Sequence, residues 1–486
     1  MSLSCLPDEV LKLVMQNVPL GDRLSSCCLV NRRLHAAAVA ATDTINLWDR
    51  KDRSELLAWL PQYGSYVTKL KVFMPKQAVL QLPCPNLQDL TLALCSVQLG
   101  PTTDGQPGVL ESCTKLTHLD LWCHIMDEAM VDCLSRLVRL QHLDVQPKRR
   151  DPAYESCAIE GLPSATLPCL QQLTHLGVSN LTVENLTQLS ALASLHFLTF
   201  GVSGGITISP STSLVFPASL RELEVQSGAE VGVLSSLPTG LRGLSLGCVV
   251  QRPSDGPGLL FSGLSRLQHL AKIGLTGGEE FVWPPAGPAY SVLTTNSMLY
   301  SLDVVGTLPE GSLSYVFPAE CRLPHLTYLR FGRALTLQDA DLIAPSLVWS
   351  AADLSRLVSC CPNLCSFIDV WLQHGRHVSV LSELHELRTL HVQYGDSEND
   401  DEDDDDSGDG DEAAEYHVSI KGLAALTQLS CLHYKDGKAP LDETLLPLTT
   451  LTALTALQVI DNNMEERDFC CNKVSQPADQ RDMGLP

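Results

Sequence analysis

The sequence predicts an α/β protein in which a short helical segment precedes an irregular solenoid, or horseshoe, of stacked units that each contribute one strand. Two observations support this fold class. A leucine pattern returns at intervals of roughly 21 to 33 residues along most of the chain, which is typical of repeat proteins. The first 41 residues instead show the apolar spacing of short helices, and they are too few to enclose a full core.

The first predicted helix begins at a Leu-Pro step. Pro7 suits the first turn of a helix, where a missing N–H is no loss, and the dipole favours the carboxylates of Asp8 and Glu9 there. Pro19 ends this helix, Asp22 suits the N-cap of a second, and a third spans about residues 31–40. The first helix carries one apolar stripe, formed by Val10, Leu11, Val14, Met15 and Val18. Three such helices leave apolar surface that must be buried against the rest of the chain or against a partner.

This segment, residues 1–41, resembles an F-box. The resemblance is carried by Leu6-Pro7-Asp8-Glu9, Val10-Leu11, Val18-Pro19-Leu20, Asp22 and Leu29-Val30-Asn31-Arg32-Arg33. Two positions depart from the family pattern, because Asn31 stands where Cys is usual and Leu34 where Trp is commoner. The resemblance implies docking onto a Skp-family adaptor and, through it, onto a cullin. The implied adaptor contacts are Leu6, Pro7, Val10, Leu11, Val14, Leu20, Leu29 and Val30.

The repeated unit after this segment is Leu-x-x-Leu-x-Leu, with Val, Ile or Phe at some positions. Its copies begin at Leu87, Leu116, Leu140, Leu173, Leu195, Leu220, Leu241, Leu270, Leu299, Leu326, Leu387, Leu429 and Leu454, with a weaker copy at Leu364 and a possible first copy at Val67. This pattern and spacing are those of leucine-rich repeats. Each Leu-x-Leu places two side chains on one face of a short strand, which only stacked neighbours can bury.

Two of these strands follow a Cys-Pro-Asn-Leu sequence, at residues 84–87 and 361–364. Such sequences resemble those of F-box proteins with leucine-rich repeats, so the two resemblances support each other.

Four regions follow from these patterns: the F-box-like segment 1–41, a packed junction 42–74, a leucine-rich solenoid 75–460 and a polar C-terminal tail 461–486. An acidic run at residues 396–415 interrupts one repeat and contains 13 acidic and no basic residues. Such self-repelling sequence is expected to form a disordered loop. The acidic net charge of −23 argues against nucleic acid or an anionic membrane as a main partner.

No combination of residues indicates catalysis, a metal or a cofactor. There is no phosphate-binding Gly-x-x-x-x-Gly-Lys-Ser/Thr loop and no Gly-x-Ser-x-Gly elbow. Cys361, Cys365, His374 and His377 are too closely spaced for a zinc finger. A calcium loop from Asp403 would lack its bidentate glutamate. The 18 cysteines without paired zinc spacing, and an N-terminus without a signal-like apolar run, predict a reducing location, cytoplasmic and/or nuclear.

The residues between the strand leucines are expected to form the substrate-binding, concave face. The candidates are His118, Asp120, Trp122, His142, Asp144, Phe197, Glu222, Glu224, Tyr328 and Arg330. Trp122, Phe197 and Tyr328 are either interface anchors or rings packed under a neighbouring loop. The acidic members suggest a basic segment in the partner, whereas the recurring histidines are attributed to the repeat itself.

The function implied by the F-box resemblance is that of a substrate-recognition subunit in an SCF-type ubiquitin ligase, which recruits a protein for ubiquitination and is not itself an enzyme. The alternative is a leucine-rich-repeat scaffold or inhibitor protein, in which the N-terminal helices only cap the array.

Overall fold

The protein is described by a computed structural model in which two compact units, Met1–Leu241 and Arg242–Pro486, are distinguished. The described residues are 6–18, 22–23, 30–47, 59–74, 83–94, 110–122, 133–146, 167–179, 181, 183–201, 215–226, 229–250, 258–277, 281, 283–332, 347–372, 375–394, 423–436 and 446–461. The predicted acidic loop 396–415 and nearly all of the predicted tail 461–486 lie outside them.

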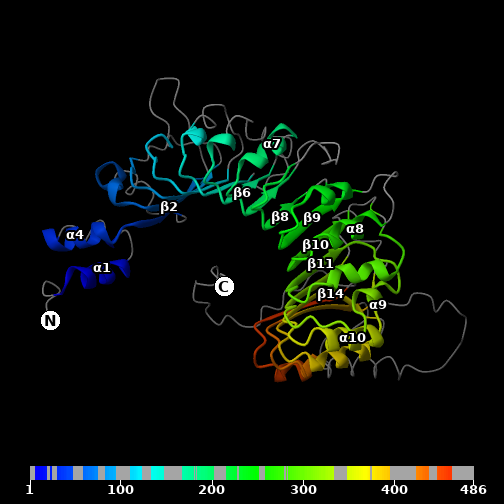
Figure 1. The fold of residues 1–486 in the computed structure, drawn as a ribbon. Coiled ribbons are helices and arrows are strands. Elements are labelled where there is room, and N and C mark those ends of the chain that lie inside the picture. Colours follow the sequence, from blue (N-terminus) through cyan, green and yellow to red (C-terminus); the bar gives the residue numbers. More distant parts are fainter. Residues whose placement is uncertain are drawn as a thin grey trace, which may run out of the picture. The chain divides into compact units, whose positions relative to one another are not determined.

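Unit 1 begins with two helices, α1 (Asp8–Gln16) and α4 (Arg32–Ala40), as Figure 1 shows. They match the first and third predicted helices, whereas the predicted middle helix falls mostly outside the described residues. Strand β1 (Thr44–Leu47) follows and pairs in parallel with β2 (Lys69–Met74). The short 3₁₀ helix η3 (Gly64–Tyr66) lies between these two strands in the sequence.

The remaining strands of unit 1 continue the same parallel sheet in chain order. They are β3 (Asp89–Leu94), β4 (His118–Trp122), β5 (His142–Gln146), β6 (His175–Val178), β7 (Phe197–Phe200) and β8 (Glu222–Val225). The described helices of the connections are η5 (Leu167–Cys169), α7 (Val183–Gln188), η6 (Leu189–Ala191) and η8 (Val231–Ser236).

Unit 2 holds a second run of parallel strands. They are β9 (Gly243–Val249), β10 (Lys272–Gly277), β11 (Ser301–Val305), β12 (Tyr328–Gly332), β13 (Val348–Trp349), β14 (Ser366–Leu372), β15 (Thr389–Tyr394), β16 (Cys431–Asp436) and β17 (Ala456–Asp461). β12 pairs directly with β14, and the two-residue β13 adds to the end of β14.

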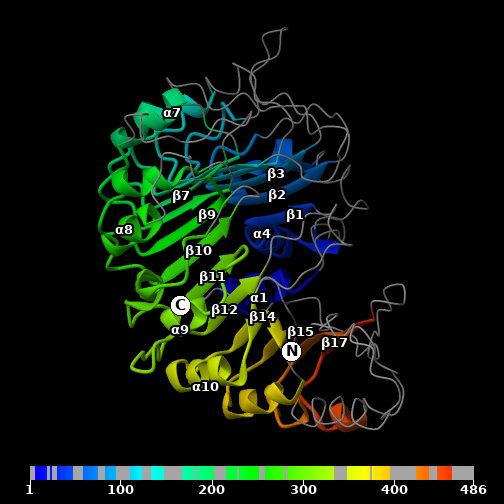
Figure 2. The ribbon, with the colours of Figure 1, turned by 90° about the vertical axis from the view of Figure 1, so that its right-hand side faces the viewer.

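The helices of unit 2 lie between consecutive strands in the sequence. They are α8 (Leu259–Ser265), η9 (Pro288–Thr294), α9 (Ser312–Val316), α10 (Ala351–Cys360), η10 (Gly375–Glu383) and η11 (Leu446–Thr450). Figures 1 and 2 show α8, α9 and α10 on the same side of the strands. α10 begins with a capping box between Ser350 and Asp353, in which each side chain accepts a hydrogen bond from the other residue's backbone N–H.

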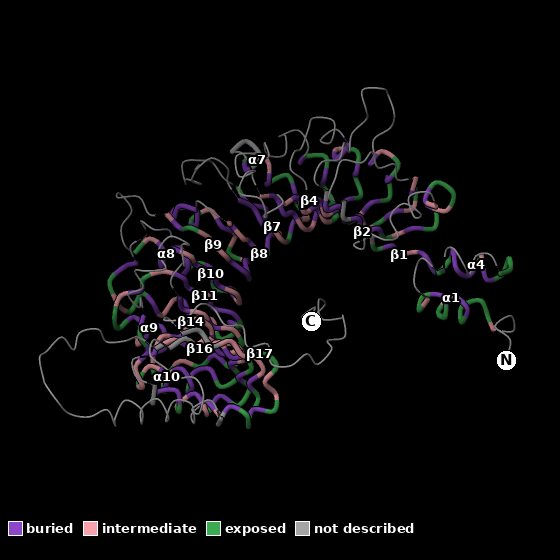
Figure 3. Tube along the Cα trace, turned by 180° about the vertical axis from the view of Figure 1, so that it is seen from behind, coloured by how far each residue is buried: buried purple, intermediate pink, exposed green. Residues whose placement is uncertain are grey.

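The leucine pattern correctly located the strands. Every predicted copy coincides with a strand, including the weaker copy at Leu364 and the early copy at Val67. The pattern leucines form the core, as Leu119, Leu302 and Leu390 illustrate with no exposed surface. Figure 3 shows buried stretches along the strands, alternating with more exposed ones. Because the strands pair in register, each leucine stacks on its equivalent in the next unit.

A hydroxyl residue directly before many strands ties neighbouring units together. Its Oγ donates a hydrogen bond of 3.0–3.2 Å to a backbone carbonyl of the preceding unit in each described case. The donors are Thr68, Thr117, Thr174, Thr327, Ser430 and Thr455. These bonds satisfy carbonyl groups at the entrance of the strands, beside the backbone ladder.

The two Cys-Pro-Asn-Leu sequences are turns with a structural role. Cys84 and Cys361 are fully buried, and each carbonyl accepts a hydrogen bond from the leucine N–H three residues later. The asparagine side chain then reaches the previous unit: Asn86 donates to the Ser65 carbonyl at 2.7 Å and Asn363 to the Pro324 carbonyl at 2.8 Å. The motif therefore joins two repeats rather than forming a reactive site.

Within the part of the chain that the structure describes, no helix has both the length and the apolar character required to cross a membrane.

Replacing a stacked leucine should destabilise unit 1. Leu119→Ala in β4 leaves a cavity in a side-chain position with no exposed surface, so we expect a loss of about 2–5 kcal/mol in the free energy of unfolding. Val138→Ala, at a position 57% exposed, is the control and should change stability by less than about 0.5 kcal/mol. Urea titrations followed by circular dichroism measure both, and equal losses would contradict the stacked-leucine core.

Candidate functional site

The N-terminal helices enclose a small core of their own. Its buried members are Leu11, Met15, Leu34, Ala37, Ala38 and Ala41, with Leu6 and Val18 packed at its edge. The alanines of α4 let the two helices approach closely, because a methyl group adds little bulk between them. The segment therefore buries one side of α1 by itself.

A buried arginine links the ends of these helices. Arg23 is only 7% exposed, and its guanidinium donates to the carbonyls of Ala41 at 2.8 Å, Val18 at 2.9 Å and Gln16 at 3.2 Å. Gln16 ends α1, and Ala41 follows α4, so one side chain satisfies carbonyls at the C-terminal ends of both helices. The cationic group is also favoured there by the two helix dipoles.

Asn31 and Arg33 fix the start of α4. The Asn31 side chain caps the helix by accepting a hydrogen bond from the Leu34 N–H at 2.8 Å. This is the position that departs from the family pattern, and the N-cap role gives the asparagine a physical reason to be there. Arg33 pairs with Asp8 of α1 at 2.8 Å, which connects the two helix starts.

An exposed apolar patch remains on the outside of this segment. Val10, Leu13 and Val14 of α1 are 43%, 65% and 36% exposed, and Val30 is 65% exposed. Leu13 and Val14 follow Val10 by three and four positions, so the three α1 residues share one helix face. We call Val10, Leu13, Val14 and Val30 the N-terminal patch.

The structure separates the predicted adaptor-contact residues into groups. Val10, Val14 and Val30 belong to the N-terminal patch, Pro7 is exposed and Leu6 is half-buried. Leu11 is not on the surface: its side chain is fully buried, so the prediction of a surface contact for it is corrected. The other two predicted contacts, Leu20 and Leu29, lie outside the described residues. Leu13 was not among the predicted contacts, because the apolar stripe assigned to the first helix did not include it.

The junction holds this segment against the first strands. The Asp43 carbonyl accepts hydrogen bonds at 2.9 Å from the N–H groups of Thr68 and Lys69. His35 of α4 meets the Tyr63 ring edge-on with centroids 5.5 Å apart, and Tyr63 stacks on Trp59 at 5.0 Å. Ring contacts and backbone hydrogen bonds thus connect α4 to the sheet of unit 1.

A second surface consists of two parallel rows of side chains on the sheet of unit 1. One row is aromatic and follows the register of β4 to β7. His118 stacks on His142 with centroids 5.7 Å apart, His142 on His175 at 4.0 Å, and His175 on Phe197 at 4.1 Å. His175 was missed as a site residue, although its place in the repeat equals that of three predicted ones, His118, His142 and Phe197. We call these four residues the aromatic row.

The second row of the sheet is acidic. Asp120 of β4 lies directly opposite Asp144 of β5. The same register position is occupied by Gly177 in β6, Thr199 in β7 and Glu224 in β8. The Nε2–H of His142 donates to Asp120 Oδ1 at 3.0 Å, and the Thr91 hydroxyl donates to Asp120 Oδ2 at 3.3 Å. Burial acts to raise the pKa of Asp120, but the hydrogen bond and charge of His142, the Thr91 hydroxyl and the charge of Lys71 together hold that pKa below the usual value.

Asp144 is held in a less favourable position. Its Oδ2 accepts a hydrogen bond from Gln146 at 3.0 Å, whereas its Oδ1 is buried without a partner in the structure. Burial raises the pKa of Asp144, and the negative charges of Asp120 and Glu224 raise it further. A Cβ at position 177 would lie 2.5 Å from Oδ1, so Gly177 provides the space for this carboxylate. A cation on this row would relieve both the burial and the repulsion.

The other predicted residues of unit 1 lie on the same sheet face. Glu222 and Glu224 are half-buried and are paired in register with Phe197 and Thr199. Trp122, at the end of β4, is 40% exposed, whereas Phe197 is half-buried against His175. The structure thus brings eight of the ten predicted substrate contacts onto one sheet: His118, Asp120, Trp122, His142, Asp144, Phe197, Glu222 and Glu224.

The two remaining candidates, Tyr328 and Arg330, lie on β12 in unit 2. Arg330 Nε donates to Asp369 Oδ2 at 2.6 Å. This contact depends on a β-bulge, because the register of β14 shifts between Phe367 and Val370 and Asp369 takes a φ of 58°. Arg330 is therefore already paired within the chain, which sequence spacing did not indicate.

Among the described residues, one group of side chains could hold a metal ion: His391, Cys431 and His433. Of the earlier zinc candidates, Cys361 is fully buried in a repeat turn, and His374 lies outside the described residues.

Comparisons with known proteins identify the N-terminal segment. The F-box domain family matches residues 3–39, so the F-box resemblance of this segment is confirmed. The chain is also similar to the crystal structure of an internalin from Listeria monocytogenes, with 16% identity and a TM-score of 0.39, over 87% of this chain and 96% of that one. A comparison with curated proteins finds no match.

Removing the buried arginine should loosen the F-box helices. Arg23→Met leaves one buried and two partly buried carbonyls without this donor, so we expect a local loss of about 2 kcal/mol or more. Amide hydrogen exchange of α1 and α4 should then be roughly 30-fold faster or more. The exposed Arg32, changed to Met, is the control. Unchanged exchange in Arg23→Met would show that the arginine does not hold the helices.

The aromatic row should make unit 1 sensitive to acid. Burial, and next the charge of His142, lowers the pKa of His175 from 6.5 to about 4. The neutral ring is thus favoured in the folded state, and its contribution is complete above pH 6.5 and is lost as the pH falls toward 4.

His175→Phe keeps the ring stack but removes the titration. The free energy of unfolding of wild type should therefore fall more steeply between pH 6.5 and 4 than that of the variant. Urea titrations across this range give both slopes. Identical slopes would mean that His175 is not held neutral by the fold.

Proposed function

We propose that this protein is the substrate-recognition subunit of an SCF-type ubiquitin ligase. In this role the F-box binds a Skp-family adaptor that is joined to a cullin, and the leucine-rich repeats bind the protein to be ubiquitinated. The chain performs no chemistry in this proposal. It raises the effective concentration of the substrate near the ubiquitin donor.

The observation that carries the proposal is the N-terminal patch within a segment that matches the F-box family. α1 fills its own core with Leu11 and Met15, so the exposed valines and leucine are not needed to hold the two helices together. Exposed apolar side chains that gather on one helix face of a small domain are typical of a protein interface. Docking of an apolar partner surface would remove these side chains from water.

The aromatic row and the adjacent acidic row support the second half of the proposal. Exposed and half-buried rings next to carboxylates suit a partner that offers arginine or lysine side chains, since a cation can stack on a ring and pair with an acid at once. The partially buried Asp144, with one oxygen unpaired, is the strongest single feature for such a contact. We therefore assign substrate binding to β4–β8 rather than to β12, because Arg330 of β12 is already paired with Asp369.

The adaptor role predicts a loss of binding when the N-terminal patch becomes charged. The variant Leu13→Asp with Val14→Asp should bind a purified Skp-family adaptor roughly 10- to 100-fold more weakly, because apolar anchors at interfaces contribute most of the affinity. Gln16→Asp is the control, since it adds a negative charge at an exposed position of the same helix without removing an apolar side chain. Isothermal titration calorimetry measures the affinity, and circular dichroism checks the fold.

Equal adaptor binding by wild type and the double variant would contradict the assignment of this surface. Absence of adaptor binding by the wild-type chain would favour the alternative, a leucine-rich-repeat scaffold or inhibitor protein with the N-terminal helices as a cap.

A further inference from the structure

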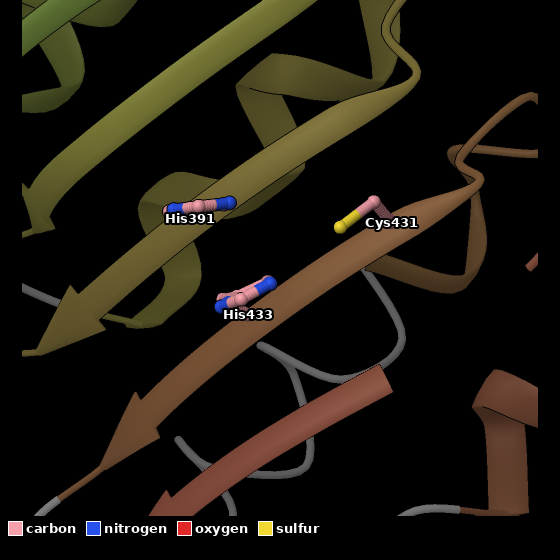
Figure 4. Close-up of side chains that lie close together, drawn as sticks. All are labelled: His391, Cys431 and His433. Carbon is pink, nitrogen blue, oxygen red and sulfur yellow. The ribbon is translucent and has the colours of Figure 1, made fainter. Parts of the chain in front are cut away.

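Strands β15 and β16 bring two histidines and a cysteine to one face of the sheet of unit 2. His391 and His433 are Cα partners, and Cys431 precedes His433 by two residues on β16. Alternate side chains of a strand share a face, so Cys431 and His433 point to the same side. Figure 4 shows the two rings beside each other with the sulfur turned toward them, and the donor atoms of all three lie within 4.8 Å of one another.

We propose that His391, Cys431 and His433 form a binding site for a borderline-soft transition-metal ion, with Zn²⁺ as the representative ligand. Imidazole nitrogen and thiolate sulfur are the donors that zinc prefers. They are poor ligands for Mg²⁺ and Ca²⁺, which take oxygen donors. The site lies on β15 and β16 and does not depend on the proposed adaptor or substrate function.

Metal binding requires a rearrangement of the rings. Donor atoms that share one zinc ion lie roughly 3.3–3.7 Å apart, so the donor atoms must draw together by about 1 Å from their present limit. His391 and His433 are stacked with centroids 4.0 Å apart and planes inclined by 21°. A metal lies in the plane of each ring that binds it, and stacked rings direct their lone pairs side by side. One ring must therefore rotate out of the stack, which side-chain torsions allow without moving the strands.

A similar ring pair elsewhere in the chain shows what makes this group different. His142 and His175 stack with the same centroid distance of 4.0 Å and the same 21° inclination. That pair is not part of any three-ligand group among the described residues, whereas the pair on β15 and β16 lies close to the thiol of Cys431. Stacking alone is thus a property of the repeat, and Cys431 supplies the third ligand.

The environment suits an ion that enters from solvent. All three side chains are half-buried, so the donors are reachable but partly shielded. Burial, with the charge of His433, lowers the pKa of His391, which favours its neutral ring. Burial raises the pKa of the Cys431 thiol, so binding breaks the S–H bond, forms a sulfur–metal bond and releases one proton to water. Three protein ligands leave the fourth tetrahedral position to water or to a donor atom of a bound partner.

The test is a titration of the full-length, chelator-treated protein with Co²⁺, followed by displacement with Zn²⁺. Co²⁺ reports a tetrahedral site through visible absorption and a thiolate ligand through charge-transfer absorption. We expect one tight equivalent of Co²⁺ with both signals in wild type. Cys431→Ser and His433→Gln should each weaken this equivalent by about 100-fold or more.

Because the chain has 18 cysteines, the matched controls remove other accessible donors. Cys248→Ser and His269→Gln change exposed residues of unit 2 and should leave the tight equivalent intact. A tight equivalent that survives in Cys431→Ser, or its absence from the folded wild-type protein, would overturn the proposal. The second measurement is the thermal midpoint of wild type, which Zn²⁺ should raise and which should not respond in folded Cys431→Ser.

Discussion

The burial of the leucine rows is the constraint on which the rest of this structure depends. A unit with one short strand cannot bury its leucines alone, so each unit must lie against the next. Parallel pairing in strict register is the arrangement that stacks Leu119 on Leu90 and on Leu143. The hydroxyl bonds before the strands and the asparagine bonds of the Cys-Pro-Asn-Leu turns act in the same direction, because each links one unit to its predecessor.

The same register has a consequence on the opposite sheet face. A residue type that recurs at one repeat position becomes a continuous row in space, so His118, His142 and His175, which lie far apart in the sequence, form a ring stack. Like charges are placed together in the same way, which is costly when they are buried. Asp120 is stabilised by His142 and Thr91, whereas Asp144 has only Gln146. An unpaired, repelled carboxylate in a folded protein is typical of a binding surface, where a partner supplies the missing charge.

The N-terminal segment follows a different principle. Its core is a few side chains between two helices, and a single buried arginine, Arg23, satisfies the carbonyls at the ends of both. Leu11 and Met15 face inward, so the outward residues Val10, Leu13 and Val14 are free to serve a partner. A cap that only faced solvent would need polar side chains at these outward positions.

The sequence by itself determined the order of the strands, because leucine spacing sets both their positions and the face that each buries. It also determined the F-box segment, whose motif residues stand at fixed local distances, and it placed eight candidate contacts on one sheet face, since neighbouring units share a register. Local patterns could not decide which way α1 turns its stripe, so Leu11 was expected outside and Leu13 was overlooked.

Contacts between units were decided only by the tertiary structure. The bulge at Asp369 that captures Arg330, the space at Gly177 for Asp144, and the meeting of His391 with Cys431 and His433 all join residues separated by tens of positions in the chain. Such contacts depend on connection lengths and strand irregularities that no single repeat encodes, because they arise only when two units are paired side by side.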